Sequence, residues 1–416
     1  MHVILDAVGE WWIHPLATHL STPYPRTVAG AISSTGMVLA CELNHSAGGV
    51  RRYEVARAGV DDHNVPALWA MDDHRPVLVW TNHNADPLLR VKVGNRAGDL
   101  GSLVKAPETS CDLEAPASYA QIHRIAHLSD VGQDTLWVFT RRGNSRWVIQ
   151  PLTVYQESGA VRFGDRMDLL DASGRQAYIT TAEAHASEGN QVIRLAWGYN
   201  PAQPVHAVRY IEIDCVNGDV MTPVDRAFRV NLAECEGDAW IRDDDVPTFL
   251  PELDDGYSRR LFAVRPGPDR PAIAYAEWSR AEPDNAEYLV TALDGDAIIE
   301  GERTLRTHRL GTSGARVGYT ADANYIAGLA FENPSRDGAV LRAASDGTTE
   351  TIARLRLAAD RFSSETLVSQ PTSNGRLIRP TTPLNGGPVA VIATEITAYD
   401  GYTDYQGNLM VIPDGH

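Results

Sequence analysis

Residues 61–84, DDHNVPALWAMDDHRPVLVWTNHN, contain two short apolar segments joined by a polar turn. The first segment ends before Asp72-Asp73, and the second, VLVW, follows shortly after it. Short apolar runs separated by a polar turn are typical of a β-hairpin. We therefore predict a hairpin with its tip at Asp72-Asp73, whose opposite end holds both His63 and His83.

The two histidines have similar polar neighbours, DDHN at residues 61–64 and NHN at residues 82–84. Carboxylates and amides can fix the tautomer of an imidazole and tune its pKa near neutrality. A single histidine of this kind more often only caps a strand end. The matched pair instead favours a functional site, with the two rings as neighbours.

The composition favours a turn-rich globular protein. The chain has 416 residues, of which 43% are hydrophobic, with 34 Gly and 24 Pro, and this argues against a mostly helical fold. The net charge is 37 − 54 = −17, which disfavours a broad surface for nucleic acid or anionic lipid. No segment is long and apolar enough to span a membrane. We expect a monomer that binds neither nucleic acid nor membrane.

The amino terminus, MHVILDAVGEWWIHPLATHL, does not have the features of a secretory signal. It lacks a basic region followed by a long apolar run and a cleavage site with small residues. This predicts a cytoplasmic protein, or a secreted one if a leader was removed.

The four cysteines, Cys41, Cys111, Cys215 and Cys235, are widely spaced and form no CxxC pair. A zinc ribbon or a redox motif is therefore not expected. Buried free thiols are the main expectation, and one disulfide or a lone metal ligand is the alternative.

Strand-forming segments recur along the whole chain. Units begin near residues 27, 63, 118, 175, 258, 316 and 374, and they show little helical periodicity. A spacing of roughly fifty residues is typical of four-stranded propeller blades, whereas a β-helix has much shorter repeats. We predict an all-β, seven-bladed β-propeller with four-stranded antiparallel blades. A single domain should span residues 1–416, with the two chain ends closing one blade together.

Propeller loops from successive blades converge on one face, so distant residues can form one site. Tyr119 and Arg141 occupy the positions in the third unit that His63 and His83 occupy in the second, and Tyr178 opens the fourth unit in the same way. An arginine fork can bind a carboxylate and acidify the adjacent carbon, from which a neutral His or Tyr removes a proton. This chemistry is β-elimination from a uronic acid, and it needs no organic cofactor.

Each of these three side chains also has an alternative interpretation in which its role is only structural. Tyr119 and Tyr178 could be packing aromatics, and Arg141 could be a solvated strand end. If the strand alternation is misphased, Arg142 replaces Arg141 as the carboxylate-binding residue.

The chain resembles the BNR-repeat-like polysaccharide lyases, propeller proteins that include ulvan lyases and rhamnose-glucuronate lyases. The resemblance covers the first half of the chain, and the second half matches only in strand rhythm. The segments that carry it are ISSTG (32–36), DDHNVPAL (61–68), TNHN (81–84), SYAQ (118–121), FTRRG (139–143) and RQAYI (175–179). The two histidine motifs, in which His83 follows His63 by 83 − 63 = 20 positions, are the most specific.

The resemblance implies cleavage of a bond from rhamnose to O4 of a uronate, in a saccharide of the ulvan or gum arabic type. The residues expected to be catalytic are His63, His83, Tyr119, Arg141 and Tyr178. The residues expected to bind substrate are Asn64, Asn84, Arg142 and Asn144. Residues 128–134 form a longer segment than the resemblance implies, and we expect them to wall one end of the cleft.

A structural Ca²⁺ or Zn²⁺ ion is also implied by the resemblance. No spacing singles out its ligands, so the metal site is unknown at this level. The candidates are Cys41, His45, His123, His127, His206 and Cys215.

Two other functions are open. One is a glycoside hydrolase on the same frame, such as a rhamnosidase that uses a histidine. The other is a non-catalytic carbohydrate-binding propeller, for which an acidic surface with many Trp and Tyr residues is adequate.

Overall fold

The computed structural model describes most of the chain. The described residues are 1–9, 17–71, 74–185, 189–225, 227–235, 239–268, 270–282, 284, 286–299, 302–314, 327–332, 339–358 and 361–414. Among them, no helix has the length and apolar character that crossing a membrane requires.

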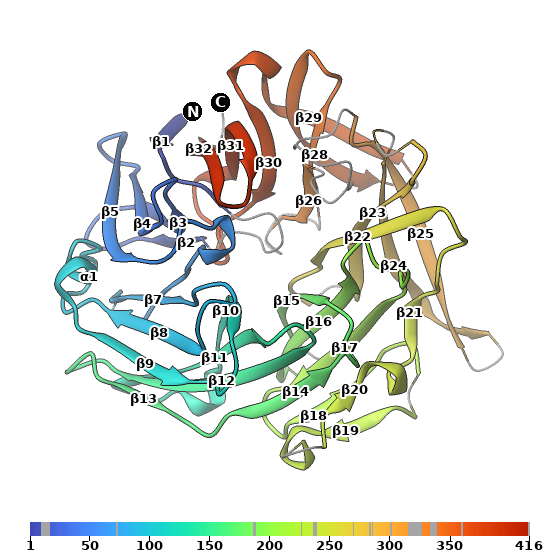
Figure 1. Ribbon diagram of the computed structural model, residues 1–416, viewed down its shortest axis with the longest axis horizontal. Helices are drawn as coiled ribbons and strands as arrows, with labels where there is room; N and C mark the ends of the chain where they lie inside the picture. The colour runs from blue at the N-terminus through green and yellow to red at the C-terminus, as the bar shows by residue number, and fades with distance from the viewer. Residues whose placement is uncertain are drawn as a thin grey trace. The chain divides into compact units, whose positions relative to one another are not determined.

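The fold is an all-β, seven-bladed β-propeller with four-stranded antiparallel blades, as predicted (Figure 1). The chain divides into two compact units. The first consists of Met1–Gly143, Trp147–Arg166 and Asn374–His416, and the second of Asn144–Arg146 and Met167–Ser373.

The first unit contains three complete blades and most of a fourth. Their strands are β2 (Ala17–Leu20), β3 (Arg26–Ile32), β4 (Met37–Asn44) and β5 (Gly49–Arg57); β6 (Ala67–Ala70), β7 (Pro76–Trp80), β8 (Leu88–Val93) and β9 (Glu108–Asp112); β30 (Arg376–Thr381), β31 (Val389–Gly401), β32 (Asp404–Pro413) and β1 (His2–Leu5); and β10 (Ala117–Arg124), β11 (Gln133–Arg142) and β12 (Arg146–Tyr155), with the short β13 (Val161–Phe163) on β12. The helices are the single turn α1 (Ser102–Lys105) and the 3₁₀ turns η1 (Asp62–Asn64), η2 (Ala126–Leu128) and η7 (Thr372–Asn374), of which η7 runs across the unit boundary.

The second unit contains the remaining strands. They are β14 (Met167–Asp171) and β20 (Ile241–Arg242), which pair with each other; β15 (Ala177–His185), β16 (Gln191–Tyr199), β17 (Val208–Asp214), β18 (Asp219–Met221), β19 (Arg229–Asn231) and β21 (Thr248–Leu250); β22 (Tyr257–Val264), β23 (Ala272–Ser279), β24 (Glu287–Ile299) and β25 (Glu302–Thr312); and β26 (Gly328–Phe331), β27 (Val340–Ser345), β28 (Thr349–Ala358) and β29 (Arg361–Pro371). Its 3₁₀ turns are η3 (Leu232–Glu234) and η4 (Asp243–Asp245). The sheet of β15 to β18 therefore carries two short strands, β19 and β21, beyond the four that the repeat predicts.

The unit starts predicted near residues 63, 118, 175, 258 and 374 agree with the starts of blades, and the one near residue 27 does not. The first blade begins at Ala17 rather than near residue 27, because β2 has only four residues and is too short to show a period-two pattern. The predicted start near residue 316 and the predicted hairpin tip, Asp72-Asp73, lie outside the described residues.

The two ends of the chain pair with each other in the first unit. Strand β1 runs antiparallel to β32, with His2 opposite Val411, and the N and C labels lie side by side in Figure 1. The single domain spanning residues 1–416 stays a prediction.

An apolar core packs the blade of β6 to β9 against the strands β10 to β12. Alternate residues of β7 and β8, such as Val77 and Val79 or Leu89 and Val91, are buried in it, as a period of two requires. Burial of each such side chain stabilises the folded chain by about 1.5–3 kcal/mol. This core therefore holds in place the hairpin that carries the histidines.

The cysteines are free thiols among the described residues, and three of the four are buried, with Cys111 half-buried. This confirms the main expectation from their spacing.

Candidate functional site

His63 and His83 lie at the same end of the hairpin formed by β6 and β7. His63 belongs to η1, just before β6, and His83 lies in the turn after β7. The rings stack with their centroids 4.2 Å apart and their planes within 13° of parallel. The structure thus places the two rings as neighbours, as the hairpin pattern predicts.

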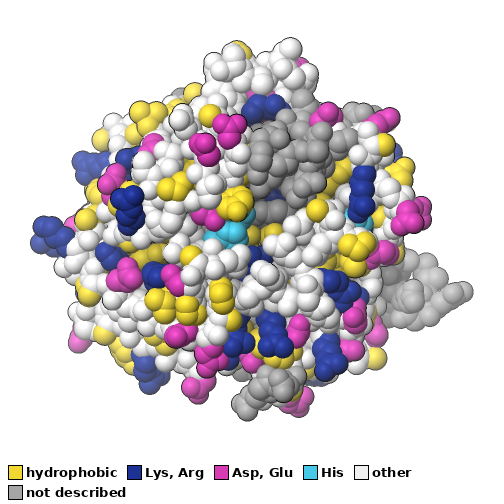
Figure 2. All heavy atoms as spheres, viewed as in Figure 1, with side chains coloured by type: hydrophobic (Ala, Val, Ile, Leu, Met, Phe, Trp, Pro, Cys, Tyr) yellow, Lys and Arg dark blue, Asp and Glu magenta, His cyan; other side chains and the backbone are white. Residues whose placement is uncertain are grey.

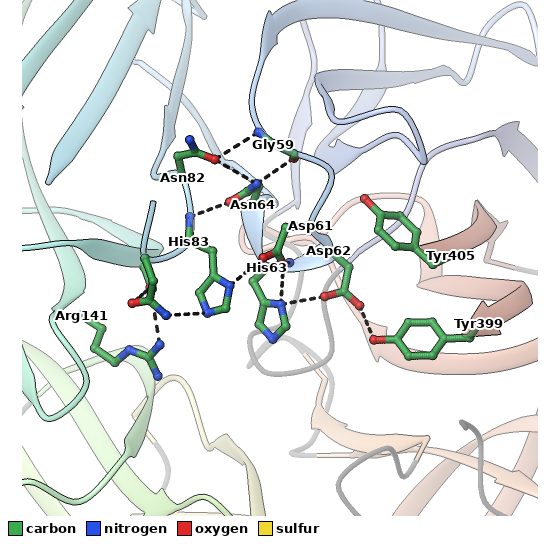
Figure 3. Close-up of polar contacts among 12 residues, drawn as sticks. Gly59, Asp61, Asp62, His63, Asn64, Asn82, His83, Arg141, Tyr399 and Tyr405 are labelled. Atoms are coloured by element: carbon green, nitrogen blue, oxygen red, sulfur yellow. Dashed lines mark hydrogen bonds and ion pairs between the residues drawn. The ribbon is translucent and has the colours of Figure 1, made fainter. Parts of the chain in front are cut away.

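Asp61 holds both histidines with one carboxylate (Figure 3). Its Oδ1 accepts from Nδ1 of His63 at 2.6 Å, and its Oδ2 lies 2.7 Å from Nδ1 of His83. Oδ1 also accepts from the backbone N–H of His63 at 2.9 Å, because Asp61 caps the 3₁₀ turn that follows it. Since both Nδ1 atoms face Asp61, the Nε2 atoms of the stacked rings face the opposite side together.

Asp62 adds a second carboxylate to His63 alone. Its Oδ1 is 2.8 Å from Nδ1 of His63, and its Oδ2 accepts a 2.7 Å hydrogen bond from the hydroxyl of Tyr399. The backbone N–H of Asp62 donates to the carbonyl of Tyr402 at 2.9 Å. The last blade therefore positions a buried carboxylate beside one histidine of the pair.

These contacts move the pKa values of the two histidines in opposite directions. Burial lowers the pKa of His63, but the charges and hydrogen bonds of Asp62 and Asp61 outweigh burial and raise it well above its usual value. Burial also lowers the pKa of His83, and the charges of His63 and Arg141 reinforce this effect against the hydrogen bond that His83 donates to Asp61. One ring is thus held as an imidazolium beside a neutral ring.

The pKa of Asp61 falls below its usual range. Burial raises it, but hydrogen bonds from His63 and His83 outweigh that effect. Asp61 therefore stays ionised and accepts from both Nδ1–H groups.

Asn64 and Asn84, both predicted to bind substrate, hold His83 in place. Asn64 accepts from the backbone N–H of His83 at 2.7 Å and donates to the carbonyl of Gly59 at 2.9 Å. Asn84, in the left-handed region with φ 56°, lies with its amide nitrogen 3.1 Å from Nε2 of His83 and accepts from the Ser118 hydroxyl at 3.0 Å. With Nδ1–H donating to Asp61, this network makes Nε2 of His83 the atom that carries the lone pair.

Tyr119 reaches the histidines through a bulge in β10. The pairing with β11 shifts between Ser118 and Gln121, and Tyr119 has a φ of 67°, which is rare for an aromatic residue. Its ring centroid lies 5.9 Å from each histidine ring. Strained backbone of this kind costs about 1–3 kcal/mol and occurs often at functional sites.

Arg141 lies opposite Ser118 on β11, and its guanidinium carbon is 4.8 Å from the centroid of the Tyr119 ring. One of its nitrogens donates to the Ser118 hydroxyl at 3.4 Å. The side chain is completely buried, so it is not a solvated strand end. Its positive charge stays close to His83 and Tyr119.

Tyr402 was not identified from the sequence. It lies in the turn between β31 and β32, and its ring meets those of His63 and His83 edge-on at 5.5 and 6.3 Å. Tyr402 is 43% exposed, and the His83 side chain is 15% exposed. On the face drawn in Figure 2, histidine atoms reach the surface beside acidic and hydrophobic side chains.

Three predicted site residues have other surroundings. Arg142 donates to the carbonyl of Leu113 at 2.5 Å and to Glu114 at 3.1 Å, so its fork is already used. Tyr178 is half-buried in β15 and Asn144 is exposed after β11, and both belong to the second unit. The first unit therefore brings together His63, His83, Tyr119 and Arg141.

Residues 128–134 do not wall this site. They form the tip of the hairpin of β10 and β11, next to Arg124 and Leu136, whereas Ser118 and Arg141 pair at its other end. Strand β10 runs over the seven residues from Ser118 to Arg124 between the two ends, so the prediction was wrong about where the tip points.

Within the described residues, the cluster with the donor atoms of a metal site consists of Asp61, His63 and His83. None of the six ligand candidates taken from the sequence belongs to it. A Zn²⁺ ion about 2.0–2.2 Å from each ligand would separate the donors, but each Nδ1 atom lies 2.6–2.7 Å from an Asp61 oxygen. Ca²⁺ prefers six to eight oxygen ligands, which two imidazoles do not provide. The geometry fits a hydrogen-bonded network and does not fit the implied ion.

No model of a known protein family matches the chain, and no curated protein matches its sequence. Among solved structures, polysaccharide lyase Uly1 is similar, with a TM-score of 0.54 and 10% identity over 93% of this chain and 88% of that one. The Penicillium chrysogenum α-L-arabinanase complexed with arabinobiose has a TM-score of 0.39 and 9% identity, over 89% and 98%. The six-bladed Aleuria aurantia lectin has a TM-score of 0.43 and 10% identity, over 88% and 98%. The likeness to Uly1 supports the propeller fold.

Proposed function

We propose that this protein is a saccharide lyase that cleaves a rhamnosyl-(1→4)-uronate linkage by β-elimination. The observation that carries the proposal is the pair His63 and His83, which share Asp61 and whose pKa values are displaced in opposite directions. Elimination needs one group that removes a proton and another that donates one, and a split pair of this kind supplies both.

His83 is the base in this proposal. Its Nδ1–H donates to Asp61, so the lone pair of Nε2 is available to take the proton from C5 of the uronate. The exposed amide of Asn84, which now lies 3.1 Å from Nε2, would move aside for the substrate. The lowered pKa keeps the ring neutral at the pH where it has to act.

His63 is the acid. Asp61 and Asp62 favour its charged form, so its Nε2–H can donate to the oxygen that leaves from C4 of the uronate. The parallel rings place both Nε2 atoms on one side, and the two reacting atoms belong to adjacent carbons of one sugar. The bond from C5 to hydrogen and the bond from C4 to oxygen break as the C4–C5 double bond forms.

Arg141 and Tyr119 support the negative charge that develops during the reaction. As C5 loses its proton, electron density moves onto the uronate carboxylate. A carboxylate bound beside the partly exposed His83 would lie in the field of the Arg141 guanidinium, which is buried 4.8 Å from the centroid of the Tyr119 ring. Burial of Arg141 strengthens that field because little water screens it.

Ultraviolet absorbance tests this function, because the C4–C5 double bond is conjugated to the carboxylate. Absorbance should rise when the protein digests oligosaccharides of ulvan or gum arabic, and His83→Ala should abolish the rise. A neutral rhamnosyl disaccharide is the control substrate and should give no signal. No rise on any uronate-containing rhamnosyl substrate would overturn the proposal.

A further inference from the structure

The second unit contains a cavity of about 320 Å³ that belongs to none of the predicted sites. It is lined by Arg146, Asp171, Ser173, Trp240 and Arg242. This volume is near the lower end for small-molecule sites, so it can hold about one sugar ring.

Strand pairing explains why these side chains share one side of the blade. β14 and β20 run parallel, with Leu170 beside Ile241 and Asp171 beside Arg242. The side chains of Leu170 and Ile241 are buried on one side of the sheet. The next residues, Asp171 and Arg242, therefore point to the opposite side. Because Trp240 lies two residues before Arg242, the same alternation brings it to the cavity side.

Arg146 is held in a fixed orientation at this cavity. Its Nε donates to Asp171 at 3.1 Å, and its guanidinium carbon lies 4.9 Å from the centroid of the Trp240 ring. The backbone N–H of Ser173 donates to the other oxygen of Asp171 at 2.9 Å. The two terminal nitrogens of Arg146 make no hydrogen bond with the described residues, so they can bind a ligand.

Arg242 supplies a cation that no described carboxylate neutralises. Its side chain is exposed and forms no hydrogen bond or ion pair with the described part of the chain. Asp171 balances Arg146, so the cavity carries one excess positive charge on a protein whose net charge is −17. The Ser173 hydroxyl likewise makes no hydrogen bond with the described residues and can bind a neutral hydroxyl group.

We propose that this cavity binds one acidic sugar residue of a saccharide, with its carboxylate between Arg146 and Arg242. Guanidinium groups bind oxyanions through pairs of parallel hydrogen bonds, and an arginine already held by a carboxylate and a ring loses little freedom on binding. The hydroxyl of Ser173 would contact the sugar ring. The choice of a saccharide over a free inorganic anion rests on the proposed function.

The test is a titration of the full chain, followed through the indole N–H signal of Trp240 in protein with isotope-labelled tryptophan. The probes are methyl glucuronide, the neutral methyl glucoside and inorganic sulfate, and Trp240→Phe assigns the signal. Methyl glucuronide should shift the signal saturably, and Arg242→Gln should weaken its binding at least tenfold. Arg270→Gln is the matched control, because Arg270 is also exposed and unpaired among the described residues of the second unit.

Each outcome decides the proposal. No saturable shift, an equal shift with methyl glucoside, or unchanged binding in Arg242→Gln would overturn it. Sulfate that binds as tightly as the glucuronide would overturn the assignment to a saccharide. The absorbance assay separates this site from the lyase proposal, because Arg242→Gln should still cleave a disaccharide. If the original protein cleaves the substrate but methyl glucuronide does not shift the Trp240 signal, only the proposal of this second site is refuted.

Discussion

His63 and His83 stack 4.2 Å apart, with both Nδ1 atoms on the carboxylate of Asp61. Two imidazolium rings at this distance would repel each other, so a first proton on His63 disfavours a second one on His83. Asp62 decides which ring is charged, because it contacts His63. The pair therefore works as one unit with an acid and a base.

Asp61→Asn should lower kcat by about 10²–10⁴-fold, since an amide cannot accept from both Nδ1–H groups and no longer fixes the tautomer of His83. Absorbance kinetics at saturating substrate measure this. Asp112→Asn in β9 changes an exposed carboxylate of the same blade and should leave kcat near its original value. Equal activity of the Asp61 variant and this control would contradict the role of Asp61.

The pH profile of kcat/KM should have two limbs. Activity should rise as the pH passes above the lowered pKa of His83, which must be neutral, and fall as the pH passes above the raised pKa of His63, which must be charged. The plateau therefore includes neutral pH. Asp62→Asn removes a charge that raises the pKa of His63, so the alkaline limb should move to lower pH while the acidic limb stays. A shift of the acidic limb alone would reverse the assignment of acid and base.

Tyr402→Ala should raise KM several-fold and change kcat less, because this ring borders the histidine pair and is available to a sugar. Tyr402→Phe keeps the ring and should behave like the original protein. The melting temperature should change little, since the side chain is 43% exposed. A loss of kcat in the Phe variant would instead give the hydroxyl a catalytic role.

Arg141→Lys should lower kcat nearly as much as Arg141→Ala. An ammonium cannot reproduce the planar guanidinium that lies over Tyr119 and donates to Ser118. Arg142→Lys is the neighbouring control and should retain activity, because Arg142 pairs with Glu114. If the Arg142 variant fails and the Arg141 variant works, the adjacent residue recognises the carboxylate.

The sequence was sufficient to predict the hairpin and the histidine pair. The apolar runs of β6 and β7 are typical of two strands joined by a turn, and the polar motifs lie at the end where His63 and His83 meet. The number of blades followed from the repeat length. These features depend on local patterns that a single sequence displays.

Other parts of the site could not be predicted from the sequence. Tyr399 lies 337 residues from Asp62, and the pairing of β1 with β32 brings the chain ends together. The φ of 67° at Tyr119 arises from a bulge that no local glycine marks. The bridging role of Asp61 depends on a turn geometry that the letters DDHN do not specify.

The most direct test of the central claim is the mass of the products formed in water labelled with heavy oxygen. Elimination adds no water, so the two product masses should sum to the substrate mass, with an unsaturated uronate and no label. A summed mass larger by one labelled water would show hydrolysis and contradict the lyase assignment.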